Sequence, residues 1–441
     1  MTIHPINAQM RSLPSVDDTR TANGAQSTPQ ISPLRPSRVV VLNDISSIGG
    51  GATGIAHASA MQLRERGIPV TLFVGDDGTR ARETGLADEI VAAGSQHILH
   101  GPRVASAFRG LHNESVRRGL AEWVEKFDTP TTIYHVHSWS KILSPSVFRA
   151  LKPVLGRTVI HAHDYFCACP NGGFYNYPTG TPCNLQPMST ACLTTNCDRR
   201  SYAHKLWRSA RHLYLTSIMR NHHIGRVLVV HEGMMPFFAS SGIAPATIGV
   251  LRNPATAWSS SRVDAEKNSA IYYVGRLDGD KGADVAARAA KLAGVPLRII
   301  GTGPMEQEIG RLNPAAELLG WRPPSELAVL CREARAVVIP TRCRETFGLV
   351  AVEALMSGIP VIASRNMLLA KEIAASGFGT TCDPSDEIGL ADTLTRMATD
   401  DALVAAMSNA AYKNAWRISM SWEQWMERLL GVYSEILEAG R

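Results

Sequence analysis

Two pairs of charged side chains in the C-terminal half of the chain could together hold a ligand that carries a diphosphate and hydroxyl groups. Glu345 and Glu353 lie on either side of the predicted start of a helix, and Arg276 and Lys281 flank a predicted tight turn. Paired cations neutralise a diphosphate and stabilise the charge that develops when it leaves. Carboxylates instead accept hydrogen bonds from hydroxyl groups, such as those of a sugar.

The elements around the two glutamates predict a ligand-binding edge of a parallel sheet. Residues 337–339 are a short apolar run typical of a buried strand, and a polar loop over 341–346 leads into a helix predicted over 347–357. Open α/β sheets bind ligands at the carboxyl ends of their strands. The helix start would present free N–H groups and a positive dipole end, which suit a phosphate. It reads Phe347, Gly348 and Leu349.

The turn that carries Arg276 and Lys281 also lies between a predicted strand and a predicted helix. Residues 270–275 predict a strand, and a helix is predicted from Ala283. The turn also spells Asp278-Gly279-Asp280, a D-x-D metal motif that is interpreted here as turn chemistry because it lies between two cations. An ordinary strand-helix crossover with solvated charges remains the alternative for both stretches.

The first half opens with a strand, a glycine-rich turn and a helix. Successive glycines let the backbone approach a ligand closely. This turn contains Gly49, Gly50 and Gly51. With Gly54, and with Asp76 after the second strand, the spacing also satisfies a dinucleotide-binding fingerprint, so a nicotinamide or flavin cofactor stays open, as does a tight turn without any ligand.

Histidines end two further predicted strands of this half. His163 closes the strand over 158–163, at the carboxyl edge where it could hydrogen-bond a transferring sugar or orient an acceptor. His135 and His137 belong to the strand over 133–137 and fit core or supporting positions equally well.

Taken together, these stretches resemble family 4 retaining glycosyltransferases, also described as glycosyl transferases group 1. The resemblance is closest over 337–364 and recurs in order over most of 38–440. It implies the α/β architecture called GT-B, with two facing Rossmann-like domains and a C-terminal helix that crosses back to the first domain. It also implies transfer of a hexose from a nucleotide diphosphate sugar to an acceptor hydroxyl, with no cofactor required.

The resemblance also implies a role for each matching residue. Glu345 and His163 would contact the donor sugar, and Glu353 would bind the ribose hydroxyls. Arg276 and Lys281 would bind the diphosphate, helped by the amides of Phe347, Gly348 and Leu349. Asn253, in the stretch VLRNPA, matches the donor-side segment at the hinge between the domains. Gly49, Gly50 and Gly51 match the glycine loop between acceptor and donor phosphates.

The length of 441 residues predicts two or more domains. We expect a disordered leader, an acceptor-side domain, a linker, a donor domain and a terminal helix that packs back on the first domain. The corresponding ranges are 1–37, 38–255, 256–268, 269–416 and 417–441. The leader lacks the apolar segment of a signal peptide, so the expected compartment is the cytoplasm.

The net charge and the position of the basic segments indicate which kinds of partner the chain could bind. A net charge of +6 is short of what nucleic-acid binding requires. The segment 199–226 is basic and interleaved with apolar residues, and 104–124 is a weaker second case. Such a surface could lie on the inner face of an anionic membrane, or could be a solvated face. A lipid-linked or growing polysaccharide acceptor, as in exopolysaccharide or cell-surface glycan synthesis, would explain both segments.

Five of the eight cysteines crowd into one segment of the first half. Their spacing fits no standard zinc module, so no metal site is predicted, although four of them could close on a tetrahedral zinc ion. Those four are Cys169, Cys183, Cys192 and Cys197. The alternative is a loop that shapes the acceptor pocket.

Four other functions remain open. A nucleotide-sugar epimerase on the same fold would make product without an acceptor, whereas a phosphorylase would need a cofactor lysine that nothing marks. A non-catalytic sugar- or lipid-binding protein is opposed by the intact set Arg276, Lys281, Glu345 and Glu353. A dehydrogenase would leave that set without a role.

Overall fold

The apolar runs of the first half form the strands of one parallel sheet. The computed structural model describes residues 34–47, 50–220 and 222–440. The seven strands are ordered β3-β2-β1-β4-β5-β8-β9. Their bounds are β1 Arg38–Asn43, β2 Val70–Val74, β3 Glu89–Ala92, β4 Thr132–Val136, β5 Thr158–Ala162, β8 Arg226–Val229 and β9 Ile248–Val250. Gly49 and residues 1–33 of the predicted leader lie outside the described residues.

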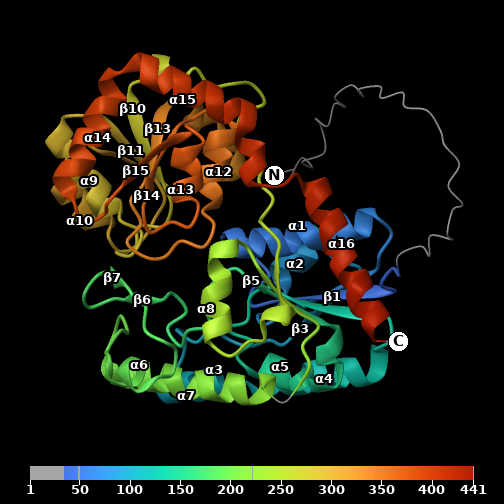
Figure 1. Cartoon of the computed structure of the whole chain (residues 1–441). Helices are drawn as coiled ribbons and strands as arrows, with labels where there is room; N and C mark the ends of the chain where they lie inside the picture. The colour runs from blue at the N-terminus through green and yellow to red at the C-terminus, as the bar shows by residue number, and fades with distance from the viewer. Residues whose placement is uncertain (1–33, 48–49, 221, 441) are drawn as a thin grey trace, which may run out of the picture. The chain divides into compact units, whose positions relative to one another are not determined.

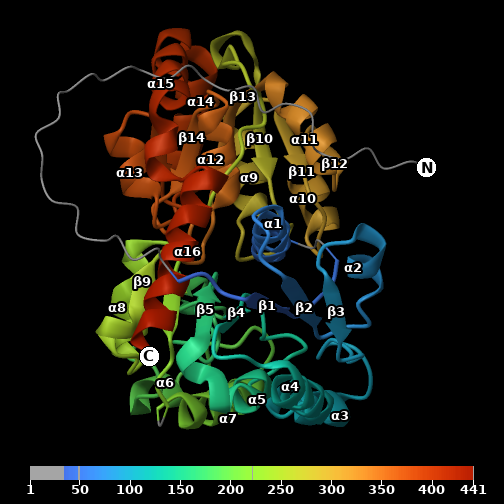
Figure 2. The ribbon, with the colours of Figure 1, turned by 90° about the vertical axis from the view of Figure 1, so that its right-hand side faces the viewer.

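Alternation along these strands sends side chains to two different helix layers, because successive residues of a strand point to opposite faces. Val40 and Tyr134 pack under one layer with Leu215, whereas Val41 packs under the other with Leu429. The first layer contains α4 (Glu114–Phe127), α5 (Ser146–Ala150) and α7 (Tyr202–Met219), and the second contains α1 (Gly51–Glu65) and α16 (Trp422–Ala439) (Figures 1 and 2). The remaining helices of this half are α2 (Thr79–Thr84), α3 (Arg103–Leu111), α6 (Thr190–Thr194) and α8 (Met235–Ser240).

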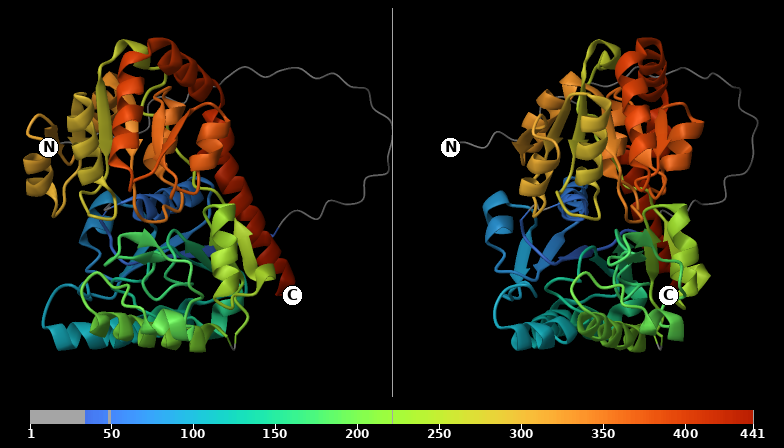
Figure 3. Two further views of the ribbon diagram at one scale, coloured as in Figure 1. Left: turned by 60° about the vertical axis from the view of Figure 1, so that its left-hand side comes forward. Right: turned by 90° about the vertical axis from the view of Figure 1, so that its left-hand side faces the viewer.

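The second half forms a parallel sheet of six strands in the order β12-β11-β10-β13-β14-β15. Their bounds are β10 Ala270–Val274, β11 Leu297–Ile300, β12 Glu317–Gly320, β13 Ala334–Ile339, β14 Val361–Ser364 and β15 Gly379–Cys382. Helices pack on both faces of this sheet (Figure 3). They are α9 (Ala283–Ala293), α10 (Glu306–Leu312), α11 (Pro324–Leu330), α12 (Leu349–Met356), α13 (Ala370–Ala375), α14 (Glu387–Thr399) and α15 (Asp401–Asn414).

The terminal helix α16 crosses back to the first half, as predicted. Its capping box is built by Ser421 and Gln424, and its buried residues Trp425 and Tyr433 pack on the N-terminal sheet. Tyr433 hydrogen-bonds His135 of β4 at 2.7 Å. Burial of this apolar stripe stabilises the helix on a sheet far from it in sequence.

Element boundaries differ from the predictions by a few residues. Helix α12 begins at Leu349, two residues later than expected, because Gly348 has a left-handed backbone (φ 77°) that ends the loop. Helix α1 begins at Gly51, inside the glycine-rich turn. No helix in the described part of the chain is both long and apolar enough to cross a membrane.

Candidate functional site

The two stretches selected from the sequence lie against each other at the carboxyl edge of the C-terminal sheet. The backbone carbonyl of Asp280 accepts hydrogen bonds from the Arg342 N–H (2.9 Å) and the Thr341 hydroxyl (3.1 Å). Gly282 has a left-handed backbone, and a Cβ there would lie 2.0 Å from the Pro340 carbonyl oxygen. Only glycine therefore allows the turn after β10 to sit this close to the loop after β13.

Lys281 and Glu345 form the centre of this contact. The Lys281 Nζ lies 2.5 Å from Glu345 Oε2, and both side chains are mostly shielded from solvent. Burial by itself raises the pKa of Glu345, but the charge and hydrogen bond of Lys281 outweigh it and leave that pKa below its usual value. The pair is therefore ionised at neutral pH, with a cation held in place before any ligand arrives.

The start of α12 faces the same place. Phe347 is buried and anchors the loop, and Gly348 adopts its left-handed backbone there. The hydrogen bonds of the described residues leave the backbone N–H groups of Gly348 and Leu349 without an acceptor. Gly51 of the glycine-rich turn is also close, because a Cβ on it would lie 2.9 Å from Leu349 Cδ1. Open N–H groups at a helix start are suited to an anion.

Arg276 lies on the outer side of the turn, where it pairs with Asp278. From the sequence, Asp278 had been assigned only a role in the turn itself. The Arg276 guanidinium contacts Asp278 at 2.5 Å, and Asp278 also contacts Arg199 of the first half at 3.3 Å. The Arg276 side chain remains largely exposed. The first acid of the D-x-D motif therefore orients two arginines.

His163 reaches this region from the carboxyl end of β5. Its backbone carbonyl accepts a hydrogen bond from Thr346 Oγ1 (2.9 Å), which ties the strand end to the loop before α12. Its Nε2 lies 3.1 Å from Nδ1 of His137. Burial lowers the pKa of His163 to about 3, so the ring is neutral. His137 thus acts as a support that fixes the orientation of His163, a role the sequence left open between core and support.

Glu353 lies within α12. Burial raises its pKa to about 7, partly opposed by a hydrogen bond from Trp258. A carboxyl group in this setting has few partners of its own, so it is available to accept hydrogen bonds from ligand hydroxyls once ionised.

Asn253 lies apart from the turn and loop. It is buried, and its carbonyl accepts a hydrogen bond from Ser419 (3.0 Å) beside the bridge between Pro254 and Met420. None of its contacts in the described part of the chain reaches Arg276 or Lys281. Its position is at the crossing between the halves, where the sequence placed the hinge, and its donor contact remains a prediction.

Asp76, the acid that a dinucleotide-binding site would need, is used by the glycine-rich turn itself. Its Oδ2 accepts hydrogen bonds from the backbone N–H (2.7 Å) and the hydroxyl (3.0 Å) of Ser46, and its Oδ1 accepts one from the Gly78 N–H (3.1 Å). The carboxylate is therefore occupied by protein donors rather than free for a ribose.

Two groups of side chains have metal-ligating atoms within 4.8 Å of one another, among the residues that the structure describes. One consists of the buried His135, His137 and His161, and the other of His231, Glu232 and Glu372. Neither contains a cysteine, and all eight cysteines are free. The second group is bound by Arg252, whose guanidinium contacts Glu232 and Glu372 at 2.7 and 2.8 Å.

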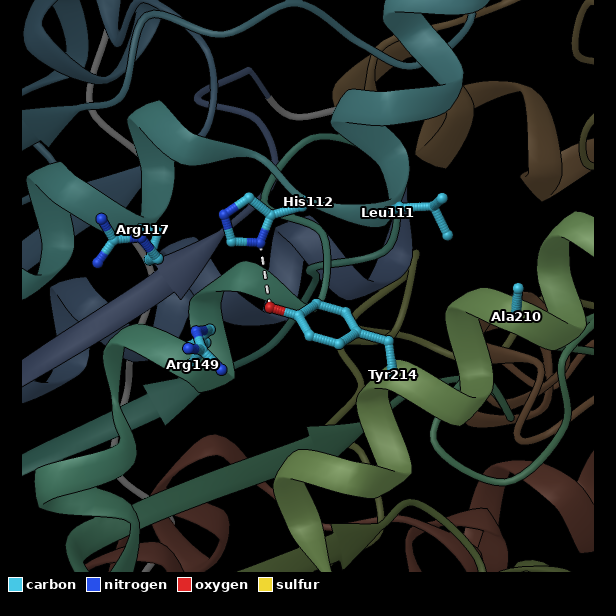
Figure 4. Close-up of a pocket in the computed structure, with 6 residues that line it drawn as sticks. All are labelled: Leu111, His112, Arg117, Arg149, Ala210 and Tyr214. Carbon is cyan, nitrogen blue, oxygen red and sulfur yellow. Dashed lines mark hydrogen bonds between the residues drawn. The ribbon is translucent and has the colours of Figure 1, made fainter.

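A separate pocket of about 570 Å³ opens on the far helix layer of the first half. Figure 4 shows that its lining side chains come from separate segments of this helix layer, with His112 hydrogen-bonded to the Tyr214 hydroxyl at 3.0 Å. The lining residues are Leu111, His112, Arg117, Arg149, Ala210 and Tyr214. Arg149 and Arg117 give the pocket a cationic wall. All of its lining residues except Arg149 lie in the two basic segments, 104–124 and 199–226, that were selected from the sequence.

Comparison with known proteins gives a family match in the second half of the chain. Residues 256–414 match the family model described as Glycosyl transferases group 1. This part of the chain belongs to the glycosyl transferases group 1 family. The match includes Arg276, Lys281, Glu345 and Glu353, whereas His163 and Gly51, which reach the same region, lie outside it.

Similar proteins carry the comparison beyond that domain. A D-inositol 3-phosphate glycosyltransferase of Corynebacterium urealyticum is 32% identical over 185 residues, which cover 38% of this chain and 43% of that protein. This match thus spans less than half of the relative's length. A protein of the same name from Mycolicibacterium smegmatis is 26% identical over 431 residues, with coverage of 91% and 92%.

Solved structures show that the fold of most of the chain is GT-B. Sucrose-phosphate synthase from Thermosynechococcus elongatus superposes with a TM-score of 0.68 at 17% identity and covers 91% of this chain and 99% of its own. Anabaena Alr3699/HepE in complex with UDP-glucose has a TM-score of 0.61 at 16% identity, with coverage of 91% and 99%. Both glycosyltransferase folds agree with the two facing sheets predicted from the sequence.

Proposed function

We propose that this chain transfers a hexose from a nucleoside diphosphate sugar to an acceptor hydroxyl, with retention at the anomeric carbon. The observation that carries this proposal is the ion pair of Lys281 and Glu345 at the open amide end of α12. A cation and free N–H groups suit a diphosphate, and a carboxylate beside them suits the hydroxyls of the attached sugar.

The diphosphate would lie between Lys281, Arg276 and the N–H groups of Gly348 and Leu349. In the free protein Glu345 supplies the negative charge that Lys281 needs, because a lone buried ammonium is costly. When the donor binds, its phosphates take over part of that role, and Glu345 becomes free to accept hydrogen bonds from sugar hydroxyls. The cations then stabilise the leaving diphosphate without a metal ion.

His163 and Glu353 would fix the two ends of the donor. Neutral His163, oriented by His137, would hydrogen-bond the sugar near the reacting carbon. Glu353 would accept from the ribose hydroxyls. The UDP-glucose complex of HepE makes UDP-glucose the first donor to test on this chain.

The acceptor is proposed to be a lipid-linked or growing polysaccharide reached from an anionic membrane surface, at which the chain would bind peripherally. Helices α3 and α7 pack together through a hydrogen bond from Trp207 Nε1 to the Ala107 carbonyl (3.1 Å). They expose large apolar side chains beside the cationic pocket, an arrangement suited to lipid chains and phosphates. These side chains are Val104, Phe108, Leu206 and Leu213.

Product analysis tests this function. The purified chain is incubated with UDP-glucose, UDP-galactose or GDP-mannose and with detergent-solubilised lipid-linked saccharides, and products are analysed by mass spectrometry and NMR. We expect an acceptor-dependent product with the α-anomeric configuration of the donor. Lys281→Met should abolish it, whereas Lys291→Met, an exposed change on α9, should not. Conversion of the nucleotide sugar without acceptor, or a β-linked product, would refute the proposal.

A further inference from the structure

Three buried histidines lie together on one face of the N-terminal sheet, and the proposed function uses only one of them. His135 lies in β4, His137 directly follows that strand, and His161 lies in the neighbouring strand β5. Side chains two residues apart on a strand point to the same face, which here is the face that α1 and α16 cover (Figure 2). At most 4% of each residue is exposed. The sheet thus brings three imidazoles, which are common metal ligands, into one buried space.

Each of these rings has a nitrogen that no group of the described chain satisfies. Nδ1 of His135 shares a hydrogen bond with the Tyr433 hydroxyl (2.7 Å), and Nδ1 of His137 shares one with His163 Nε2 (3.1 Å). The Nε2 atoms of His135 and His137, and both nitrogens of His161, are buried without a hydrogen-bond partner among the described residues. Because a buried polar atom without a partner destabilises a fold, this cluster indicates a site for a ligand that binds nitrogen.

The nitrogens are also close enough to share one ion. One ring nitrogen from each of the three histidines lies within 4.8 Å of one from each of the others. Zn–N bonds of about 2.0–2.1 Å in a tetrahedral site place nitrogens roughly 3.4 Å apart, so each distance has to shorten by no more than about 1.4 Å. The rings are stacked, with the planes of His135 and His161 13° apart. Rotation about the Cβ–Cγ bonds would turn their open nitrogens toward one ion.

The remaining nitrogens of His135 and His137 make the contacts that metal-bound histidines need. A ligating imidazole donates its second ring N–H to a fixed acceptor, which sets the tautomer and the orientation of the ring. The Tyr433 hydroxyl is such an acceptor for His135, and His163 Nε2 is one for His137. Tyr433 is fully buried on α16, so it is itself held in place. Two of the three rings are therefore oriented with Nε2 as the nitrogen left for a metal.

We propose that His135, His137 and His161 bind a divalent transition-metal ion, of which Zn²⁺ is the expected one. Imidazole nitrogens suit zinc, and three histidines with water in the fourth position form a recognised zinc coordination. The ion would join β4 to β5 and, through Tyr433, to α16. It would thus stabilise the packing of the terminal helix on the first half. This inference goes beyond the proposed function and does not rest on it.

The ion would also fix a proton next to His163. With Nε2 of His137 bound to the metal, the proton of that ring stays on Nδ1, which then donates to His163 Nε2. His163 consequently carries its own proton on Nδ1, from where it can donate a hydrogen bond to a ligand. The ion is a structural support, and no step of sugar transfer passes through it. Only this effect on His163 depends on the proposed function.

Metal analysis of the purified full-length chain tests the site. The chain is purified without chelators from cells supplied with zinc, and without a histidine tag, which would itself bind metal. Divalent transition metals are measured by mass spectrometry, and metal-depleted protein is titrated with Zn²⁺ and with Co²⁺. We expect about one equivalent of bound metal per chain and visible absorption from bound Co²⁺. His161→Gln should lower the metal affinity at least about tenfold, because one of three protein ligands is lost.

His212→Gln is the matched control, because His212 is a buried histidine on α7 that belongs to neither group of possible ligands among the described residues. It should keep the metal. Tyr433→Phe keeps the ring but removes the acceptor of His135, so the metal affinity should fall about tenfold, which a role in packing alone would not produce.

Circular dichroism shows which variants are folded, and the wild-type metal content stands even if one of them is not. Less than about 0.1 equivalents of metal in the wild type, both as purified and after titration, would overturn the proposal. A folded His161→Gln variant with the metal affinity of the wild type would overturn it as well. A loss of metal in folded His212→Gln equal to that in His161→Gln would do the same.

Discussion

The raised pKa of Glu353, the proposed ribose ligand, predicts that this residue lowers the stability of the protein at neutral and alkaline pH. Its pKa is about 7 in the folded chain against an ordinary 4.5, because burial penalises its ionised form. A folded-state pKa above the unfolded one means that the folded state holds its proton to higher pH. Stability from this group is thus fully present below pH 4.5 and is lost as pH rises through about 7.

The magnitude follows from the difference between the two values. Ionising Glu353 in the folded state costs at most about 3 kcal/mol at pH 8, and under about 1 kcal/mol at pH 5. Glu353→Gln removes this cost. If the C-terminal half that contains Glu353 unfolds as one domain, the variant should melt higher than the wild type by roughly 5–10 °C at pH 8. At pH 5 the gain should be small.

The assay is thermal unfolding at pH 5 and pH 8, with Glu427→Gln on α16 as control because the Glu427 carboxylate is exposed. The same Glu353→Gln protein should bind UDP about 10- to 100-fold more weakly at pH 8, because it loses charge-assisted hydrogen bonds to the ribose. If Glu353→Gln and wild type show the same dependence of melting temperature on pH, the burial argument is wrong. If UDP binding is unchanged, the ribose assignment is wrong.

Three further predictions concern His137, Glu372 and the exposed apolar surface of α3 and α7. His137→Phe keeps a ring but removes the 3.1 Å hydrogen bond to His163, so kcat should fall about tenfold. UDP, which lacks the transferred hexose, should bind as it does to the wild type. Equal losses in kcat and in UDP affinity would contradict the positioning role. Glu372→Gln should weaken the contacts to His231 and Arg252 and lower the melting temperature by a few degrees, and an unchanged melting curve would show these contacts to be neutral. Phe108→Asp combined with Leu213→Asp should reduce sedimentation with phosphatidylglycerol vesicles at least about tenfold without altering UDP binding, and undiminished sedimentation would exclude the α3–α7 surface as the membrane contact.

The sequence predicted the fold well where local patterns decide structure. Apolar runs bounded by glycine or proline gave the strands, and the family resemblance implied that the terminal helix crosses back to the first half, where Trp425 and Tyr433 of α16 now pack. The turn at Lys281 and the loop at Glu345 were predicted to share a site, because both follow strands of one parallel sheet. Their 2.5 Å contact shows how close the two strand ends come.

Other features depend on contacts between residues far apart in sequence, which no spacing reveals. His137 could be core or support until β4 and β5 paired and placed it beside His163. Arg199 was assigned only to a basic segment, yet it reaches Asp278 of the other half. Lys205 looked like one more cation of an amphipathic helix, and only its burial among cysteines separates it from the exposed ones.

Calorimetric titration of UDP and of uridine tests the central claim that Lys281 and the start of α12 bind a diphosphate. Lys281→Met should weaken UDP binding about 10- to 100-fold, the loss of one or more charged hydrogen bonds, while uridine, which has no phosphate, binds wild type and variant alike. Lys291→Met should bind both ligands as the wild type does. UDP binding that is unchanged in Lys281→Met, or a loss of uridine binding as large as that of UDP, would contradict the account.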